Sequence, residues 1–405
     1  MTSATETTDR YRWVILGLLW ITYLVVFLHR LSIGPLAPFL KESFGVTSTQ
    51  VGLLMSAASL GYMVSMFPTG WVVDRIGARW PIIIGVFIAG TCMLTVFFVK
   101  SYPWLITLTF MTGLGSGFLF PSTTQGVIAW FPLRERATAM GFKQTAVNIG
   151  GIVSAATLPT IALLLGWRYC FLILGILSLA IGATAFFLYR DPPLHSLPAG
   201  PSASKDSLSL GEIIRSREIW LLACCGMCLT WFEMTLITYL VLYLKEVLLL
   251  GVVAAGVLLA MAEAGGAVAR PGGGILSDRV FKGNRKKVLM LMAAMASVTS
   301  LLVGLLGPYL SWLLYPVLIL LGMGGIGFGG IYLTLLSEFA GRRGAGKAVG
   351  LGGIITLAGS AIGPAVFGRI LDAFGSYTFA WLSLTFVSTV CVFLLFLVKE
   401  EKRKI

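Results

Sequence analysis

Long apolar stretches alternate with short polar ones along the whole 405-residue chain. Most of the apolar stretches reach about 20 residues, the length that an α-helix needs to cross the hydrocarbon core of a bilayer. The first stretch is long and many others follow, so it is expected to span the membrane rather than to be a cleaved signal. The pattern therefore predicts an all-α integral membrane protein with twelve transmembrane helices. The spans are expected near 13–37, 48–72, 80–99, 103–128, 137–160, 168–189, 218–244, 251–276, 287–307, 311–337, 346–371 and 377–398.

A polar motif occurs twice, once in each half of the chain. The copies are Gly70-x-x-x-Asp74-Arg75-x-Gly77-x-Arg79 and Gly274-x-x-x-Asp278-Arg279. The glycine and the aspartate repeat at one common offset, close to half of the chain length. A polar run rich in Pro, Ser and Gly separates the two sets of six spans and is typical of a linker. The sequence therefore predicts two pseudo-symmetric six-helix bundles, residues 1–190 and 218–405, joined by a cytoplasmic linker over 191–217.

The composition supports a membrane protein, since 57% of the residues are hydrophobic and 12% are charged. A soluble protein carries about twice that share of charge. The net charge of +13 would suggest a nucleic-acid partner in a soluble protein, but most of the 30 basic residues fall in alternate loops. By the positive-inside rule this asymmetry predicts a multi-pass inner-membrane protein with both termini in the cytoplasm. The expected partner is the lipid bilayer, and no nucleic acid is expected.

Neither the cysteines nor any motif indicates a cofactor or an enzyme. All six cysteines lie within apolar runs, and the group Cys224, Cys225 and Cys228 has no histidine or carboxylate at a metal-ligand spacing, so buried thiols without a metal are predicted. The sequence shows no phosphate-cradling loop and no arrangement of a nucleophile with a base. We therefore expect no cofactor other than a coupling proton, and no enzymatic activity.

The twin motif, the span count and the linker resemble those of the major facilitator superfamily. The resemblance implies a secondary transporter with alternating access, in which two six-helix halves rock around a central site. It also implies gating roles for the motif loops, with the aspartate of each loop latching a neighbouring helix terminus; topogenic charges are the alternative. The gating residues would be Asp74, Arg75, Arg79, Asp278 and Arg279.

Two further segments resemble those of organic-anion carriers. His29-Arg30 stands where anion:cation symporters carry an Asp-Arg pair in their first span. Those symporters have an Arg and a Glu in span four, where this chain has Thr109 and Ser116, so their carboxylate pair for proton coupling is missing. Ala269-Arg270-Pro271 is similar to span eight of monocarboxylate and oxalate carriers, in which the Arg anchors the carboxylate.

Charged side chains inside the spans are the candidates for function, because one charge at mid-bilayer costs at least about 2.5–3.5 kcal/mol. A guanidinium can hold a carboxylate through two parallel hydrogen bonds, and buried acids or a histidine can carry a proton. The candidate substrate-binding residues are Arg270, Arg30, Lys143, Asn148 and Tyr332. The candidate proton-coupling residues are Glu233, Glu263 and His29. The alternatives are acid–arginine pairs, a structural histidine and a lysine that extends to the headgroups.

Together these features predict proton-coupled symport of a small organic anion, such as a monocarboxylate or sugar acid, by a carrier that functions as a monomer. The anion would bind midway between the halves. One alternative is an antiporter that exports drugs or exchanges two anions. Another is a sensor that has a transporter fold and moves nothing, although its linker and tails would be short for docking a partner.

Overall fold

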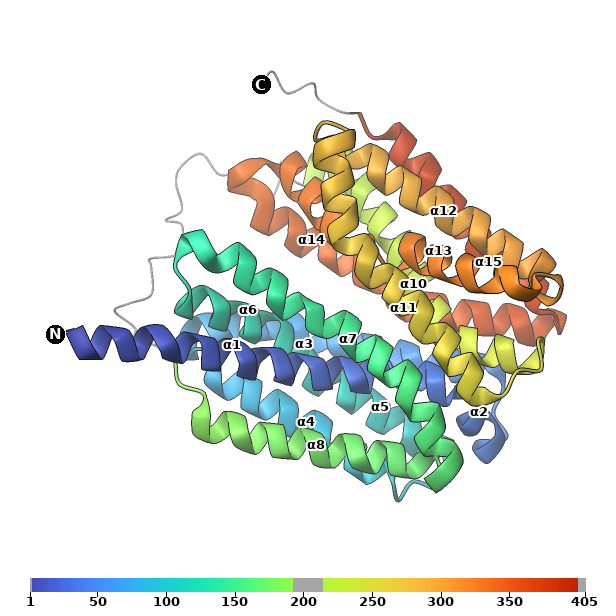
Figure 1. Cartoon of the computed structure of the whole chain (residues 1–405), viewed down its shortest axis with the longest axis horizontal. Coiled ribbons are helices and arrows are strands. Elements are labelled where there is room, and N and C mark those ends of the chain that lie inside the picture. Colours follow the sequence, from blue (N-terminus) through green and yellow to red (C-terminus); the bar gives the residue numbers. More distant parts are fainter. Residues whose placement is uncertain (1, 192–213, 400–405) are drawn as a thin grey trace. The chain divides into compact units, whose positions relative to one another are not determined.

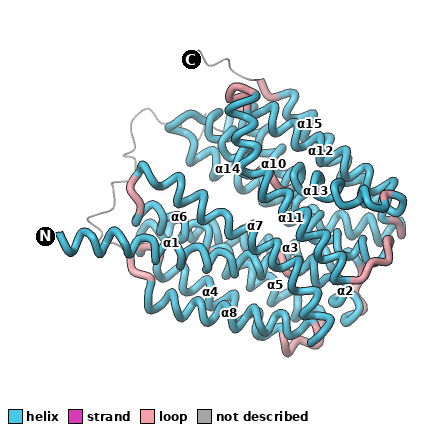
Figure 2. Tube along the Cα trace, in the orientation of Figure 1, coloured by secondary structure: helices cyan, strands magenta, loops and turns pink. Residues whose placement is uncertain are grey.

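The computed structural model describes residues 2–191 and 214–399, with the backbone alone at 2–10, 133, 137, 311 and 340–348. Its regular structure in those ranges is helical (Figures 1 and 2). The first helices are α1 (Thr2–Arg30), α2 (Ile33–Phe44), α3 (Ser48–Ile76), α4 (Arg79–Val96), α5 (Tyr102–Gly117), α6 (Leu119–Trp130), α7 (Leu133–Leu165) and α8 (Trp167–Leu188). The others are α10 (Arg217–Glu246), α11 (Val252–Ile275), the π-helical turn η2 (Leu276–Val280), α12 (Arg285–Leu306), the short turns η3 (Gly307–Tyr309) and η4 (Ser311–Leu313), α13 (Leu314–Gly325), α14 (Gly329–Phe374) and α15 (Tyr377–Leu397).

Twelve segments of the described chain are long and apolar enough to cross a bilayer, which confirms the predicted number of spans. They are Tyr11–Phe44, Ser48–Ile76, Arg79–Val96, Tyr102–Trp130, Arg134–Leu165, Trp167–Leu188, Arg217–Glu246, Val252–Val280, Arg285–Tyr309, Leu314–Phe339, Val349–Phe374 and Tyr377–Leu397. The protein is therefore a multi-pass helical membrane protein. The tenth and eleventh spans share the continuous helix α14, because no proline lies between Gly329 and Gly363 to break it.

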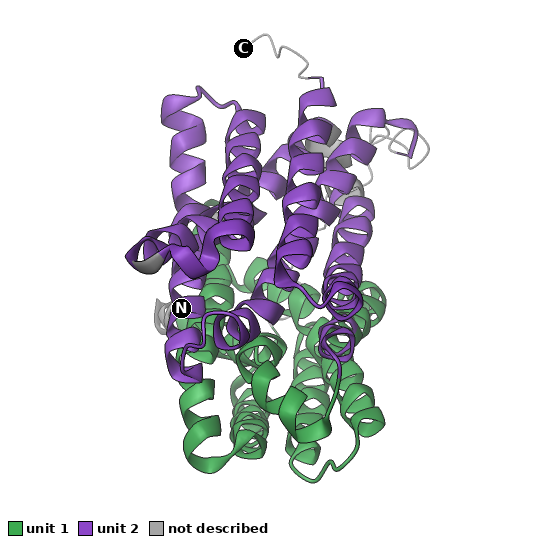
Figure 3. Ribbon diagram, turned by 90° about the vertical axis from the view of Figure 1, so that its right-hand side faces the viewer, with its two compact units in different colours: residues 1–46, 57–202 green, residues 47–56, 203–405 purple. Residues whose placement is uncertain are grey.

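The contacts divide the chain into two compact units (Figure 3). Unit 1 comprises residues 1–46 and 57–202, and unit 2 comprises residues 47–56 and 203–405. The predicted bundles, 1–190 and 218–405, differ from these units at residues 47–56, which are grouped with unit 2 although they precede most of unit 1. Of the expected linker, residues 192–213 lie outside the described residues.

Unit 1 is built on close helix pairs in which α1 packs on α7 and α4 packs on both α5 and α8 (Figure 1). Glycine allows α3 to approach α5 at backbone distance. A Cβ at Gly113 would lie 2.1 Å from Ala58 O, and one at Gly61 would lie 2.1 Å from Phe110 O. Small residues of this kind are what membrane helices use for close packing, and here they hold the helices that line the site described below.

The first span is interrupted after Arg30, as the proline-containing run that follows it suggests. Helix α1 ends at Arg30, and α2 begins at Ile33. Two serine hydroxyls donate hydrogen bonds to backbone carbonyls at the break. Ser32 Oγ donates to His29 O at 2.7 Å, and Ser154 Oγ donates to Leu31 O at 3.2 Å. Irregular backbone at membrane depth is tolerated where such bonds exist inside the protein. The break leaves His29 and Arg30 at a helix end in the middle of a span.

Unit 2 is built in the same way, with α10 on α14, α11 on α13 and α12 on α15. The start of α3 belongs to this unit because the end of α14 binds it. Asp372 accepts hydrogen bonds from Ser48 N at 2.9 Å and from Thr49 N at 2.7 Å. Tyr239 Oη lies 2.7 Å from Ser48 O and 2.9 Å from Pro364 O. A carboxylate on two free backbone N–H groups complements the positive end of a helix, so the first turn of α3 is capped by a residue distant in sequence.

Replacing Asp372 with alanine is expected to lower the free energy of unfolding by about 1 kcal/mol, the usual loss when a capping side chain is removed. The midpoint of thermal unfolding in detergent micelles measures the effect. Asp372→Asn is the matched variant, because it keeps the size of the side chain and one acceptor oxygen but loses the charge and the second acceptor. Equal midpoints for wild type and Asp372→Ala would show that the cap contributes nothing to stability.

Candidate functional site

Arg30 is the buried cation of unit 1 that lies beside a cavity. Its guanidinium sits 4.5 Å from the centre of the Tyr62 ring, on α3, and the residue is 8% exposed. Within the described residues the guanidinium has no ion pair, and the buried Nε atom has no hydrogen-bond partner. An aromatic face offsets part of the cost of burying a cation, but a carboxylate would offset far more. Arg30 is therefore a buried cation whose charge no acid of the described chain balances.

The cavity next to Arg30 has a volume of about 20 Å³ and is formed within unit 1. His29, at the end of α1, lines it together with Arg30. Helix α5 contributes Thr109, Thr112 and Ser116 to the lining, and mostly apolar residues of the other helices complete it. Thr109 and Ser116 are the positions where the resembled symporters have charged residues, so α5 presents hydroxyls here in place of charges.

His29 is held from the side of α8. Its Nε2 lies 2.6 Å from Ser178 Oγ and 3.3 Å from Leu174 O, while its Nδ1 is buried without a partner in the described part of the chain. Ser178 fixes the ring, so His29 has only one nitrogen left for another group.

Lys143 lies inside unit 1 and not at the headgroups, contrary to the alternative of extension to the surface. It is 1% exposed. Its Nζ contacts the hydroxyls of Thr123 and Thr124 at 3.2 and 3.0 Å and lies 4.6 Å from the centre of the Tyr23 ring. The side chain of Tyr23 is hydrogen-bonded to that of Tyr62. The same tyrosine pair thus connects Lys143 with Arg30, so two cations of unit 1 share one aromatic framework.

The charged group of unit 2 contains two acids and one arginine. Arg270 Nη2, from α11, lies 3.5 Å from Glu233 Oε1, from α10. Glu263 lies seven residues before Arg270, on the same face of α11. It is 2% exposed, and its Oε1 lacks a partner among the described residues. The charged group therefore consists of one long ion pair with a second acid beside it.

The other two candidate ligands are buried polar residues. Asn148, on α7, is 8% exposed, and its Oδ1 has no hydrogen-bond partner among the residues that the structure describes. Tyr332, on α14, shares a 2.8 Å hydrogen bond with Thr356 Oγ1. Asn148 is therefore available for a ligand, whereas Tyr332 is held within unit 2.

The first copy of the polar motif covers the end of α3 and the start of α4. Asp74 is exposed, and Arg75 lies over the exposed Trp71 ring at 3.5 Å. The aspartate that caps a helix in unit 1 is Asp191, which accepts hydrogen bonds from Ala78 N at 3.1 Å and Arg79 N at 3.3 Å. Within unit 1 the start of α4 is therefore capped by a residue at the start of the expected linker, and the latch by Asp74 stays a prediction. Arg79 adds a bond from Nη2 to Phe186 O at 2.9 Å.

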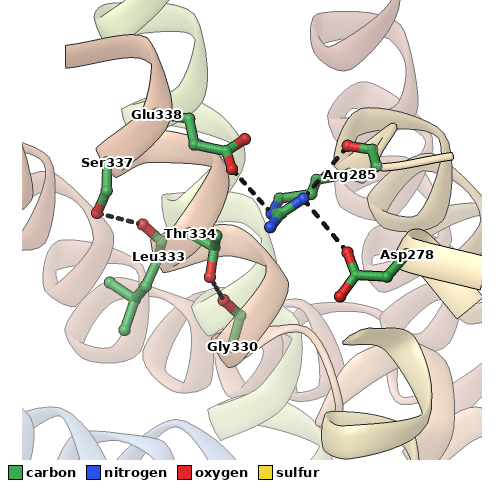
Figure 4. Close-up of polar contacts among 8 residues, drawn as sticks. Asp278, Arg285, Gly330, Leu333, Thr334, Ser337 and Glu338 are labelled. Carbon is green, nitrogen blue, oxygen red and sulfur yellow. Dashed lines mark hydrogen bonds and ion pairs between the residues drawn. The ribbon is translucent and has the colours of Figure 1, made fainter. Parts of the chain in front are cut away.

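The second copy forms an ion-pair cluster around Arg285, which Figure 4 shows between two acids. Arg285 Nε lies 3.2 Å from Glu338 Oε1, and Nη1 lies 3.6 Å from Asp278 Oδ1. Asp278 is in the π-helical turn η2, Glu338 is on α14, and Arg279 is exposed. The cluster connects the motif loop to α14, which runs from the tenth span into the eleventh.

Several residues of the site were missed in the sequence. Tyr62, Ser178 and Thr123 are ordinary residues of apolar helices, and no local pattern distinguishes them. Arg285 and Glu338 were visible only as loop charges. The signal that found Arg30, His29, Lys143, Glu233 and Glu263 was the cost of a polar group inside a span, and that signal does not identify partners.

Three relatives of known description match most of the chain. A probable sulfoacetate transporter of Cupriavidus necator is 28% identical over 67% of this chain and 66% of its own length. A hexuronate transporter of Bacillus subtilis is 24% identical over 90% of this chain and 89% of its own. A membrane sensor protein of Escherichia coli is 26% identical over 92% of this chain and 89% of its own.

The fold is also that of a solved transporter structure. A bacterial homologue of the human lysosomal transporter Spinster, in an inward-facing and occupied conformation, superimposes with a TM-score of 0.82 at 17% identity. The match covers 96% of this chain and 97% of the other. The family model described as Major Facilitator Superfamily matches residues 19–364. With twelve spans, two compact units and this match over most of its length, the chain belongs to the Major Facilitator Superfamily.

Proposed function

We propose that this protein carries a small organic anion across the membrane by alternating access, in symport with protons. The observation that carries the proposal is Arg30, a buried guanidinium without an acid partner in the described chain and beside a cavity. A cation in such a place is costly to the folded protein. The cost is offset when an anionic passenger forms charge-assisted hydrogen bonds with the guanidinium.

The charged group of unit 2 supports proton coupling. Arg270 Nη2 forms an ion pair with Glu233 Oε1 at 3.5 Å, and Glu263 lies in the same cluster. When one of these acids takes a proton, Arg270 loses a competing negative charge and becomes available to an anion. Binding of a proton and binding of the anion therefore favour each other, as symport requires.

The remaining candidates take supporting roles in the same proposal. Lys143 and Asn148 stabilise the anion from unit 1, and Tyr332 positions polar groups of unit 2. The motif residues Asp74, Arg75, Arg79, Asp278 and Arg279 act as gates and do not touch the passenger. The named relatives that carry sulfoacetate and hexuronate, both organic acids, favour an anion as passenger.

The similarity to a membrane sensor protein supports a second candidate function, detection of an anion without transport. Purified protein in liposomes separates the two. We expect labelled monocarboxylates and sugar acids to accumulate when the outside is more acidic than the inside, and less so without the gradient. Binding of an anion with no uptake would support the sensor, and uptake of only cationic or neutral compounds would contradict an anion carrier.

A further inference from the structure

Lys143 is a second buried cation of unit 1. It lies on α7 and is 1% exposed, and no ion pair that the structure describes includes it. Its Nζ lies 4.6 Å from the centre of the Tyr23 ring and 5.3 Å from that of the Phe120 ring. Aromatic faces offset only part of the cost of burying an ammonium. A lysine, unlike an arginine, can release its proton inside a protein, so Lys143 can lose its charge whereas Arg30 cannot.

The two hydroxyls that contact this amine are bonded differently. Thr123 Oγ1 lies 3.2 Å from Nζ and donates its hydrogen to the backbone carbonyl of Leu119, so toward the amine it can only accept. Thr124 Oγ1 lies 3.0 Å from Nζ, and in the described residues this hydroxyl makes no other hydrogen bond. Its hydrogen is therefore free to turn toward the amine or away from it. Thr123 is buried and Thr124 is half-buried, so we expect protons to reach the amine from the side of Thr124.

This arrangement satisfies both protonation states of Lys143. The charged ammonium donates to both hydroxyls and turns its third N–H toward the Tyr23 ring. The neutral amine donates to Thr123 and accepts from Thr124, whose hydroxyl only has to rotate about one bond. Neither state leaves the nitrogen with an unsatisfied lone pair, and both make two hydrogen bonds. A change of protonation therefore breaks no contact that holds α7 in place.

The charged groups around Lys143 connect its proton to the anion site. From α1, Tyr23 contacts the amine, and its side chain is hydrogen-bonded to that of Tyr62 on α3, over whose ring Arg30 lies. Helix α6 presents the two hydroxyls and the Phe120 ring. Helices α2 and α8 also pack on α7, and neither brings an acid or a histidine into contact with the amine in the described part of the chain. The charge that the tyrosine pair connects to Lys143 is therefore that of Arg30.

We propose that Lys143 carries a second coupling proton, so that two protons accompany each anion, one on Lys143 and one on an acid of unit 2. The inference rests on the proposed function, in which Arg30 holds the anion. Before an anion binds, the charge of Arg30 opposes a second positive charge on Lys143. An anion on Arg30 cancels this repulsion and favours the proton, and by linkage the proton favours the anion. Both protons leave before the carrier returns without an anion.

The charge moved in one cycle tests the inference. A monoanion with one proton moves no net charge, whereas a monoanion with two protons moves one positive charge. Labelled glucuronate and lactate are the probes, in proteoliposomes with equal pH on both sides and a potassium gradient with valinomycin to set the membrane potential. We expect an inside-negative potential to drive accumulation by the wild type, up to tenfold for each 59 mV or so. Accumulation that does not respond to the potential would overturn the inference, and this result needs no variant.

Two substitutions distinguish a charge that switches from one that is fixed. Lys143→Met cannot bind a proton and Lys143→Arg cannot release one, so both should lose the response to the potential while a pH gradient still drives uptake. Their affinities should differ, with Lys143→Met binding the anion about fivefold or more weakly than Lys143→Arg. The wild type should match the arginine variant at acidic pH and the methionine variant at alkaline pH. Lys100→Met, at an exposed position, is the control and should keep the wild-type response.

A change at Thr124 provides a test that leaves the lysine in place. Thr124→Val removes an acceptor from the ammonium and a donor from the amine. Because the bond to the charged form is the stronger one, the half-maximal anion affinity should move to lower pH by about half a unit or more. Thr107→Val removes an exposed hydroxyl, bonded to Pro103 O at 2.8 Å, and should leave this pH unchanged. If neither variant of Lys143 folds, an unmoved profile in Thr124→Val overturns the inference.

The outcomes separate the inference from the function on which it depends. Uptake by the wild type that responds to pH but not to the potential would remove the second proton and leave the proposed symport standing. A response to the potential that persists in Lys143→Met and Lys143→Arg would assign the second proton to another residue and overturn the role of Lys143. No uptake of either probe would overturn the proposed function and the inference together.

Discussion

Replacing Arg30 with glutamine is expected to lower the affinity for the transported anion at least about 30-fold and to abolish measurable uptake. Losing one partner of a buried, hydrogen-bonded charge pair costs about 2–5 kcal/mol, and each 1.4 kcal/mol is a factor of ten. Stability should move the other way. Arg30 is a buried cation without an acid partner in the described chain, so its removal should leave the midpoint of thermal unfolding unchanged or raise it.

Arg168 provides the control for this variant. It also lies on an aromatic ring in unit 1, 4.4 Å from the centre of Trp167, and its Nη2 donates to Val99 O at 3.2 Å. It does not line the cavity. Arg168→Gln should therefore keep uptake within about twofold of wild type, while Arg30→Lys should be intermediate because it keeps the charge and loses the planar fork. Near-normal uptake by Arg30→Gln would show that Arg30 does not bind the transported anion.

Replacing Glu263 with glutamine is expected to abolish accumulation driven by a pH gradient. Glutamine keeps the size of the side chain and its place on α11 but cannot bind or release a proton. Exchange of internal for external anion should continue, because exchange needs the anion site and no net proton movement. Proteoliposomes loaded with unlabelled anion measure exchange, and empty ones with an acidic outside measure accumulation.

Glu246 supplies the matched control for Glu263. It lies at the end of α10, is exposed, and accepts a hydrogen bond from Tyr377 at 2.8 Å. Glu246→Gln should accumulate the anion as wild type does. Glu233→Gln should bind the anion more tightly at alkaline pH, because Arg270 then loses the carboxylate that lies 3.5 Å from its Nη2. Gradient-driven accumulation by Glu263→Gln at the wild-type level would remove this acid from the coupling scheme.

Much of the fold could be predicted because bilayer crossing depends on local properties. An apolar run of sufficient length must form a helix in lipid, where its backbone groups have no other partners. The break after Arg30 follows likewise from the prolines at 35 and 38. The helical connection between the tenth and eleventh spans was not predicted, because Gly341, Gly344 and several charges suggest a loop. No proline interrupts the helix there.

The candidate site could be predicted only in part. The free-energy cost of a polar or charged side chain inside a membrane depends only on the residue type and its depth in the span, so it can be read from the sequence. This cost identified His29, Arg30, Lys143, Glu233, Glu263 and Arg270. Their partners follow no such rule. Ser178 orients His29 from a helix almost 150 positions away, and Tyr62 lies under Arg30 by virtue of the packing of α3. Asp191 and Asp372 cap helices for the same reason, although neither belongs to the repeated motif.

The sequence by itself determined that this chain crosses a membrane twelve times, that it repeats one polar motif, and that a few charges lie deep in its spans. Each of these depends on the transfer of local segments from water to lipid. Only the tertiary structure decided that Arg30 has an aromatic ring and a cavity for neighbours while Arg270 has an acid. Hydrogen bonds and ion pairs form between atoms within a few ångströms of each other, and helix packing alone brings those atoms together.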